Sequence, residues 1–332
     1  MKKHLSPLLS LLIPLLFLLG ACAPAVTPTD TPTEVPTPTL DVSAPTPTLA
    51  PPDDTIEMVD GLGRTVTLSG PAQRIVSIAP SNTEILYAIG AGSQVVGRDA
   101  FSDFPAEAQS VADVGGGFGE LNMELIVSLE PDLILSADII SAENIQALTD
   151  LGLPVFALAN PLTYEDLLGN LKLVGRLTGH ETDAETLASQ LAERIQTVRT
   201  AVAGAESKPT VFYQLDSTDP SAPYTAGPGN FIDTLITEAG GINVTGDMDS
   251  PWVQISLEEL ITRNPDVIIV GDFTWGGVTA ADVLARSGWE GIKAIVDGQV
   301  FEFDDNLVSR PGPRMVDGLE QMAKLLHPDL FK

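Results

Sequence analysis

The sequence predicts an α/β protein with two similar lobes, each built on a central parallel sheet, joined by one long α-helix. Short apolar segments alternate with segments of helical periodicity in both halves of the chain, which is typical of parallel sheets covered by helices. Residues 121–135 and 255–269 have closely similar sequences, which indicates an internal duplication. Residues 183–204 lack proline and place apolar side chains at helical spacing, so they predict a helix about 30 Å long.

Residues 1–22 predict an export signal. Two lysines precede an apolar run from Leu5 to Leu19, and this run is shorter than the roughly 20 residues that a membrane-spanning helix needs. The run ends in Leu-Gly-Ala-Cys22, which resembles the bacterial lipoprotein signal, in which the cysteine is lipidated; a membrane-anchor helix is the alternative. Cys22 is the one cysteine of the chain, so no intramolecular disulfide is expected.

Residues 23–54 consist mainly of proline, threonine and acidic residues without apolar periodicity. Such a composition cannot bury enough surface to fold, so this segment predicts a disordered tether. The whole chain has 45 acidic and 17 basic residues, a formal net charge of −28. That balance argues against nucleic acid as a partner, because phosphate binding needs basic patches.

Residues 55–160 are expected to form the first lobe. It begins with a hairpin around the turn Asp60-Gly61-Leu62-Gly63, and buried strands and helices follow in alternation. The expected elements after the hairpin are strand 74–79, helix 82–91, strands 95–97 and 131–136, helix 142–152 and strand 154–158.

Residues 161–206 are expected to link the lobes through helices 164–177 and 183–204. Residues 207–332 then predict the second lobe, because strands and helices alternate again. Its expected elements are strands 210–215, 266–271 and 300–303 and helices 231–241, 257–264, 280–288 and 312–326.

The repeated segment places a glutamate at the same position in each lobe. At a constant offset of 134 residues, Glu124 aligns with Glu258, each in the first turn of a predicted helix. One explanation is that acidic side chains suit the positive end of a helix dipole. The other is that two matching acidic tips bind a partner with two basic pockets. A second alignment, of residues 82–97 with 231–246, has an offset of 149 and confirms the repeated order with an insertion.

The carboxyl ends of the predicted strands hold the candidate binding residues, because ligands of α/β lobes bind at that edge. Ser81 and Asn82 follow the first strand, and Arg310 precedes Pro-Gly-Pro. Arg310 is either a polar anchor for a ligand or a structural ion-pair partner. Aromatic residues are 5% of the chain, yet several occupy predicted loops, where they either plug the lobe ends or line a cleft for a broad, flat, largely apolar ligand. These aromatic residues are Phe101, Phe118, Tyr224, Trp252 and Trp275.

From about Arg74 to His327 the chain resembles the iron-siderophore and cobalamin class of ABC-transporter substrate-binding proteins, and within it the cobalamin-binding proteins. The stretches that carry this resemblance are RIVSIAPSNTEILYAIGAG, FSDFPAEAQ, LNMELIVSLEPDLIL, PYTAG, PWVQISLEEL and SRPGPR. The resemblance implies the class III periplasmic-binding-protein fold, with one rigid helix between two lobes. It also implies a monomeric, extracytoplasmic, lipid-anchored protein that delivers its ligand to the permease subunits of an ABC importer.

The resemblance implies roles for particular residues. The family's two permease-docking glutamates fall on Glu124 and Glu258. An acidic residue that the family places shortly before its C-terminal arginine matches Asn306 by spacing better than Asp305. The implied ligand-binding residues, with the polar candidates added, are Phe101, Phe118, Tyr224, Trp252, Arg310, Asn306, Ser81 and Asn82.

Three positions depart from the cobalamin-binding pattern, because Ala137, Leu307 and Phe118 stand where members of that group can carry tryptophan. The ligand therefore stays open between cobalamin or another corrinoid and, alternatively, a ferric siderophore or haem, with no further cofactor. Anionic catecholate complexes need several basic side chains, and only Arg310 and Arg98 are placed near the expected cleft.

Three other classes of protein fit the sequence less well. A direct metal binder needs a cluster of histidines and carboxylates, whereas His4, His180 and His327 lie far apart in the chain, so no metal site is expected. An enzyme needs a nucleophile, a base and an acid in one site, and no such set stands out. An adhesion domain on a tether would have a cleft that binds no small molecule.

Overall fold

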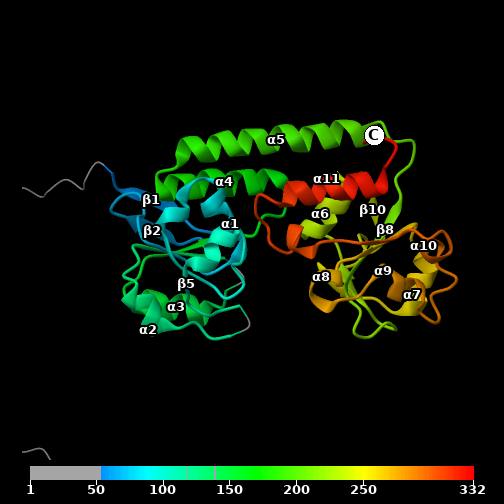
Figure 1. The fold of residues 1–332 in the computed structure, drawn as a ribbon, viewed down its shortest axis with the longest axis horizontal. Coiled ribbons are helices and arrows are strands. Elements are labelled where there is room, and N and C mark those ends of the chain that lie inside the picture. The colour runs from blue at the N-terminus through cyan, green and yellow to red at the C-terminus, as the bar shows by residue number, and fades with distance from the viewer. Residues whose placement is uncertain (1–53, 118, 138–139) are drawn as a thin grey trace, which may run out of the picture. The chain divides into compact units, whose positions relative to one another are not determined.

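Two open β-sheets, one in each half of the chain, organise the molecule (Figure 1). The computed structural model describes residues 54–117, 119–137 and 140–332, and all of them fall in one compact unit. The predicted signal peptide with Cys22, the tether before Asp54, and Phe118 lie outside the described residues. None of the helices in the described part of the chain is both long and apolar enough to cross a membrane.

The first sheet has five parallel strands in the order β5-β4-β3-β6-β7. Strands β3, β6 and β7 are buried along their whole length, as expected for a parallel sheet with helices on both faces. The hairpin β1–β2 precedes it, in agreement with the sequence. The elements are β1 Ile56–Val59, β2 Thr65–Leu68, β3 Ile75–Ser77, α1 Pro80–Ala88, β4 Val95–Arg98, β5 Ala112–Asp113, α2 Met123–Ser128, β6 Leu133–Ala137, α3 Ala142–Asp150 and β7 Val155–Leu158, with short 3₁₀ helices at Ala91–Gln94 and Ala106–Ser110.

The second sheet repeats this topology and adds an antiparallel pair of strands. The strands β10, β8, β12 and β13 are parallel and lie in the same order as β4, β3, β6 and β7 of the first lobe. Strands β9 and β11 pair antiparallel and attach to β8. The elements are β8 Thr210–Asp216, β9 Tyr224–Ala226, α6 Phe231–Glu238, β10 Ile242–Asn243, β11 Trp252–Gln254, α7 Leu257–Arg263, β12 Val267–Val270, α8 Phe273–Gly276, α9 Ala280–Leu284, α10 Lys293–Val296, β13 Val300–Glu302, a 3₁₀ turn Asp305–Leu307 and α11 Met315–Leu326.

The duplicated sequence therefore forms a duplicated structure. In each copy a side chain caps the helix, since Asn122 accepts from the Leu125 amide and Ser256 from the Glu259 amide. A short turn then leads to a buried strand. At the start of that strand, Asp132 accepts from the amides of Gln73 and Arg74, which enter the neighbouring strand β3. The equivalent carboxylate in the second lobe accepts from the first amide of β8.

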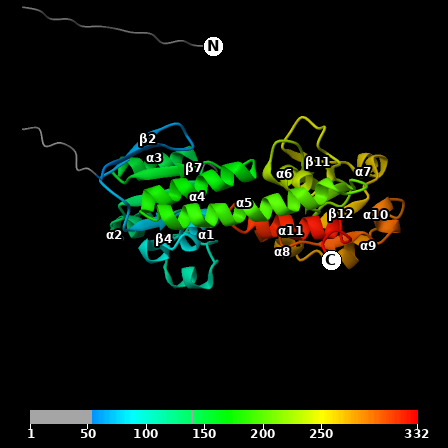
Figure 2. The same ribbon diagram turned by 90° about the horizontal axis from the view of Figure 1, so that it is seen from above.

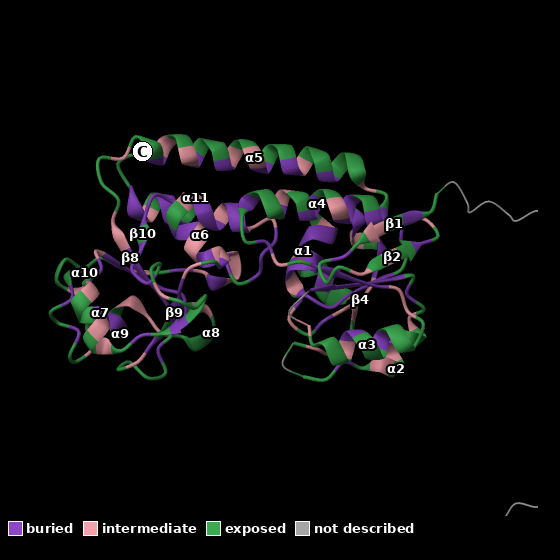
Figure 3. Cartoon of the chain, turned by 180° about the vertical axis from the view of Figure 1, so that it is seen from behind, coloured by how far each residue is buried: buried purple, intermediate pink, exposed green. Residues whose placement is uncertain are grey.

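A layer of helices runs across both sheets. α4 spans Tyr164–Thr178 and α5 spans Glu181–Ala203, which is 23 residues or about 35 Å. Figures 1 and 2 show α5 lying along α4 and then along α11, and Figure 3 shows its exposed outer side. Its buried positions recur every three or four residues, as the sequence predicts: Ala184, Ala188, Leu191, Ile195, Val198 and Val202. The single long helix between two α/β halves is confirmed.

A second connection joins the halves, and the sequence does not predict it. Residues 308–314 leave the second sheet and pass over the first turn of α1 before α11 begins. The Arg314 guanidinium donates to both carboxylate oxygens of Glu84 on α1, at 2.8 and 2.5 Å. Arg310 pairs with Asp103 of the first half. The last helix begins at Met315 rather than Gly312, since Pro313 disfavours helical backbone at the residue before it.

Three segments that read as loops are regular structure. Tyr224–Ala226 and Trp252–Gln254 form strands β9 and β11, and Phe273–Gly276 forms the short helix α8. The two strands are paired across an intervening helix and strand, so no local alternation reveals them. Although these segments are regular structure and not loops, they keep the predicted position at the carboxyl ends of parallel strands.

Candidate functional site: a pocket between the two sheets

A pocket of about 640 Å³ lies at the carboxyl end of β3 and receives residues from both lobes. The first lobe supplies the turn between β3 and α1, the segment after β4, a glycine after β5, and an isoleucine two residues before α3. The second lobe supplies α8 and the stretch after β13. The residues that line it are Ile78, Ala79, Pro80, Asp99, Phe101, Gly117, Ile140, Trp275, Asp305, Ser309 and Arg310. Its position is the ligand-binding edge of α/β sheets, and its walls are mainly apolar.

Two aromatic rings from opposite lobes meet in this pocket. The rings of Phe101 and Trp275 are 6.4 Å apart between centroids and nearly perpendicular, at 83°. Gly117 has a φ of +67°, and a Cβ there would lie about 2.1 Å from the Phe101 ring. Only glycine leaves room for that ring. Trp275 is 57% exposed, so a large apolar face remains available to a ligand.

The charged groups of the pocket are mostly neutralised within the protein. Arg310 is only 5% exposed, its guanidinium pairs with Asp103, and its central carbon lies 5.5 Å from the Trp275 ring centroid. Burial raises the pKa of Asp99, although Ser102 and the Phe101 amide bond to it. Burial likewise raises the pKa of Asp305, which accepts from the Tyr213 hydroxyl at 2.9 Å.

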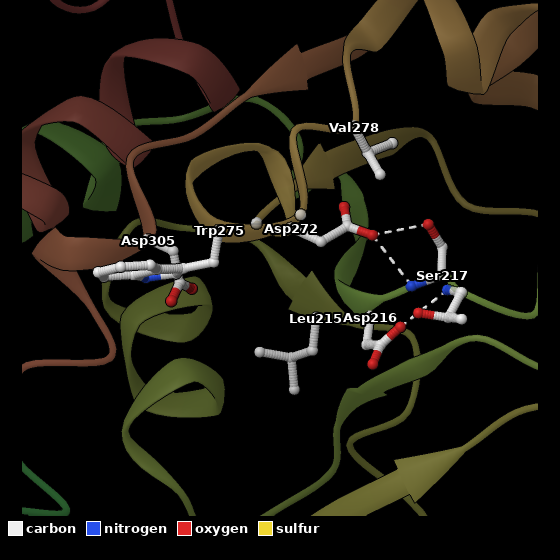
Figure 4. Close-up of a pocket in the computed structure, with 10 residues that line it drawn as sticks. Leu215, Asp216, Ser217, Asp272, Trp275, Val278 and Asp305 are labelled. Carbon is white, nitrogen blue, oxygen red and sulfur yellow. Dashed lines mark hydrogen bonds between the residues drawn. The ribbon is translucent and has the colours of Figure 1, made fainter. Parts of the chain in front are cut away.

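A second hollow of about 450 Å³ adjoins the first and shares Trp275 and Asp305 with it (Figure 4). Its polar wall is rigid, because Asp272 accepts from the Ser217 amide at 3.0 Å and the Ser217 hydroxyl at 2.6 Å. Behind it Arg286 donates to the same hydroxyl, and burial lowers the pKa of this arginine. No cluster of three or more histidine, cysteine or acidic side chains among the described residues is arranged to hold a metal ion.

The structure separates the predicted binding residues into two groups. Phe101 and Arg310 line the interlobe pocket. Tyr224 and Trp252 share one face of the antiparallel β9–β11 pair, where they are 47% and 51% exposed. The Trp252 ring packs against another aromatic ring at the start of α6, with centroids 6.0 Å apart.

The polar candidates lie beside the pocket rather than on its wall. Ser81 and Asn82 are buried in the first turn of α1, and the Asn82 amide donates to a β6 carbonyl at 3.4 Å. Asn306 donates to the Asp304 carboxylate at 2.9 Å, while its neighbour Asp305 lines both hollows. The roles predicted for these side chains stay predictions.

A known protein family matches most of this chain. The family profile described as "Periplasmic binding protein" matches residues 75–307. The chain belongs to the periplasmic binding protein family. This is the family that the resemblance in the sequence indicates, and the class III fold of the prediction is confirmed by the structural likeness.

Three relatives show the range of this family. An uncharacterized ABC transporter substrate-binding lipoprotein of Bacillus subtilis, YvrC, is 32% identical over 82% of this chain and 86% of its own length. A cobalamin-binding protein of Halobacterium salinarum is 28% identical over 81% of this chain and 73% of its own. The crystal structure of the periplasmic heme-binding protein RhuT from Roseiflexus sp. RS-1 has a TM-score of 0.69, at 26% identity over 78% of this chain and 99% of that one. The protein is thus an ABC-type substrate-binding protein of the B12, siderophore and heme group.

Sequence reasoning gave no role to three groups that this binding protein places in its pocket. In the sequence, Trp275 is one of several aromatic residues in predicted loops, and no pattern marks Asp99. Asp305 was set aside because its neighbour fits the family spacing better. The available signal was position, since Asp99 directly follows β4, and Trp275 and Asp305 come within five residues of the carboxyl ends of β12 and β13.

The two repeated glutamates lie away from the pocket. Glu124 and Glu258 occupy the first turns of α2 and α7 and are exposed. Neither carboxylate has a side-chain hydrogen bond or ion pair within the part of the binding protein that the structure describes. Figures 1 and 3 show α2 and α7 on the side opposite α5, one in each lobe.

Proposed function

We propose that this binding protein captures cobalamin or a related corrinoid between its lobes and presents it to the permease of an ABC importer. The supporting observation is a pocket with an apolar aromatic face from each lobe, Phe101 and Trp275, whose one arginine is already paired. Such a pocket suits a broad, flat ligand without a large negative charge.

The chemistry of a corrinoid matches the remaining polar groups. A corrin ring is a flat macrocycle fringed by neutral amides, which both donate and accept hydrogen bonds. The carboxyl groups of Asp99 and Asp305 lie on the pocket wall and can accept from amide N–H groups. Arg310 can donate to an amide oxygen with its remaining N–H groups. An anionic ligand would instead face two carboxyl groups and one guanidinium whose charge Asp103 neutralises.

Haem or a ferric siderophore is the second candidate. Haem is also flat, and its carboxylates could replace Asp103 on Arg310, which is the one observation that favours it. A structural relative of this protein, RhuT, is a heme-binding protein. The two candidates differ in what they require of Arg310, because only an anionic ligand has to break the existing ion pair.

Three further elements of the proposal concern delivery. Cys22 carries the lipid that holds the protein at the outer face of the membrane. Glu124 and Glu258 contact basic side chains of the permease, since they are exposed, matched and without partners among the described residues. The protein acts as a monomer with two docking tips.

The test is a calorimetric titration of the purified full-length protein with cyanocobalamin, with haemin and a ferric hydroxamate run in parallel. We expect one-to-one binding of cyanocobalamin and at least a tenfold loss of affinity in Trp275→Ala, because the ring supplies one wall of the pocket. Trp252→Ala is titrated beside it, because this tryptophan is similarly exposed and is predicted to bind the ligand, yet lies outside the pocket wall.

Each outcome is decisive for one part of the proposal. Binding of haemin or the ferric complex without cyanocobalamin would replace the corrinoid and keep the transport role. Loss of cyanocobalamin binding in Trp252→Ala but not in Trp275→Ala would move the site to the β9–β11 strand pair. Binding of none of the three ligands would refute the proposed ligand class altogether.

A further inference from the structure

The helices that carry the repeated glutamates each expose one large aliphatic side chain. Val127 in α2 is 45% exposed and Ile261 in α7 is 41% exposed. The two residues are equivalent in the repeat, at the same offset of 134 that relates Glu124 to Glu258. In each helix the aliphatic residue follows the glutamate by three positions, so both side chains lie on one face.

Other repeated residues of these segments are explained by contacts inside the chain. Asn122 caps its helix, and Asp132 accepts from the amides at the start of β3. The hydroxyls of Ser128 and Thr262, one position after each aliphatic residue, bond back to their own helices. The duplicated sequence thus has a structural reason at these positions.

The exposed glutamates suit the positive ends of their helix dipoles, but neither has a side-chain hydrogen bond or ion pair among the described residues, and the aliphatic residue beside each is 41% or 45% exposed. An exposed aliphatic residue alone is ordinary, but here it recurs at one equivalent position beside one equivalent carboxylate. Both aliphatic residues are β-branched, so they lose little side-chain freedom on being covered. An exposed carboxylate binds a cation weakly while water competes, and an adjacent apolar contact that excludes water strengthens such a pair.

We propose that Val127 with Glu124, and Ile261 with Glu258, form two matching contact surfaces for the permease. The inference rests on the proposed docking role and adds an apolar component to it. The partner it fits is a pair of like subunits, each with a basic side chain beside an apolar recess. A partner with two equivalent halves matches the repeat, because the same carboxylate and aliphatic pair stands in each lobe on the side opposite α5 (Figure 1).

The test uses the full-length lipoprotein and its own permease–ATPase complex, reconstituted in liposomes with cyanocobalamin present. The measured quantity is the concentration of binding protein that gives half-maximal stimulation of ATP hydrolysis. We expect Val127→Ser with Ile261→Ser to raise this concentration at least tenfold, since two apolar contacts are lost. Calorimetric affinity for cyanocobalamin should stay unchanged in the same double variant.

The control replaces two other exposed aliphatic residues, Leu151 and Val296, which are 51% and 68% exposed and lie outside α2 and α7. Leu151→Ser with Val296→Ser should leave stimulation unchanged. If Val127→Ser with Ile261→Ser stimulates like the wild type while Glu124→Gln with Glu258→Gln does not, the apolar contact is refuted and docking by glutamate stands. A wild type that binds cyanocobalamin but never stimulates hydrolysis would refute the importer role and this surface together.

Discussion

Replacing Arg314 by methionine should destabilise the protein strongly at pH 7 and weakly at pH 5. Arg314 holds Glu84 through two hydrogen bonds, and the Glu84 side chain is 2% exposed. Methionine keeps much of the side-chain volume but leaves a buried carboxylate without its partner. Breaking a buried pair in this way typically costs about 3–5 kcal/mol.

Protonation limits this cost and gives it a pH dependence. Burial raises the pKa of Glu84 above its ordinary 4.5, and the hydrogen bonds and charge of Arg314 partly offset that rise. Without Arg314 the pKa of Glu84 in the folded state rises further. A carboxyl group with a raised folded-state pKa lowers stability above its unfolded pKa, and this loss shrinks as the pH falls from the folded pKa to the unfolded one. Each pH unit between these two pKa values is worth about 1.4 kcal/mol, so a neutral Glu84 in the folded variant costs more stability at pH 7 than at pH 5.

Guanidinium unfolding of wild type and Arg314→Met at both pH values measures the effect. The difference in unfolding free energy should be larger at pH 7 than at pH 5, by at most about 2.7 kcal/mol for the two pH units. Glu84→Gln combined with Arg314→Met should remove most of that pH dependence while keeping the loss of contact with the Phe104 ring, which lies 3.9 Å from the guanidinium carbon. A single variant that loses the same stability at both pH values would refute the reasoning.

Two further predictions concern the repeat and the helical layer. Asp132→Ala should lower the unfolding free energy by about 1–2 kcal/mol, because the amides entering β3 lose their acceptor. Glu124→Ala should change the unfolding free energy by less than about 0.5 kcal/mol. Equal losses for the two variants in urea unfolding would contradict this division between structural and docking residues. The hydrogen bond from Arg194 lowers the pKa of Glu320, so this carboxylate stabilises the fold above its unfolded pKa and the contribution is lost as the pH falls through the lower folded pKa. The melting temperature of Glu320→Gln should therefore fall less than that of wild type between pH 5 and pH 3. Equal falls in melting temperature would show that the Arg194–Glu320 pair contributes nothing to stability.

Patterns that are local in the chain predicted most of the fold. Apolar runs such as those of β6 and β12 are buried along both faces and need no partner to be recognised. The 23-residue helix α5 shows its buried stripe directly in the spacing of its apolar residues. The repeat placed equivalent helices in equivalent positions, because a sequence duplicated within one chain keeps its topology.

Contacts between distant residues could not be predicted in the same way. Strands β9 and β11 pair across an intervening helix and strand, and their short segments carry no alternation of their own. The partner of Arg310 lies in the other lobe, so the sequence alone left it open whether this arginine binds a ligand or an acidic residue; the structure shows the ion pair with Asp103. Trp275 reaches the pocket only because α8 turns it toward Phe101.

The long helix α5 also restricts how the length of this protein can change. Removing one residue from a helix shortens it by 1.5 Å and rotates everything after it by 100°. α5 packs against α4 in one lobe and α11 in the other, so such a deletion would turn the second lobe away from the first and separate the halves of the ligand pocket. Insertions and deletions in α5 are therefore confined to whole turns that preserve the relative rotation of the lobes, whereas the exposed loops of either lobe can change length freely.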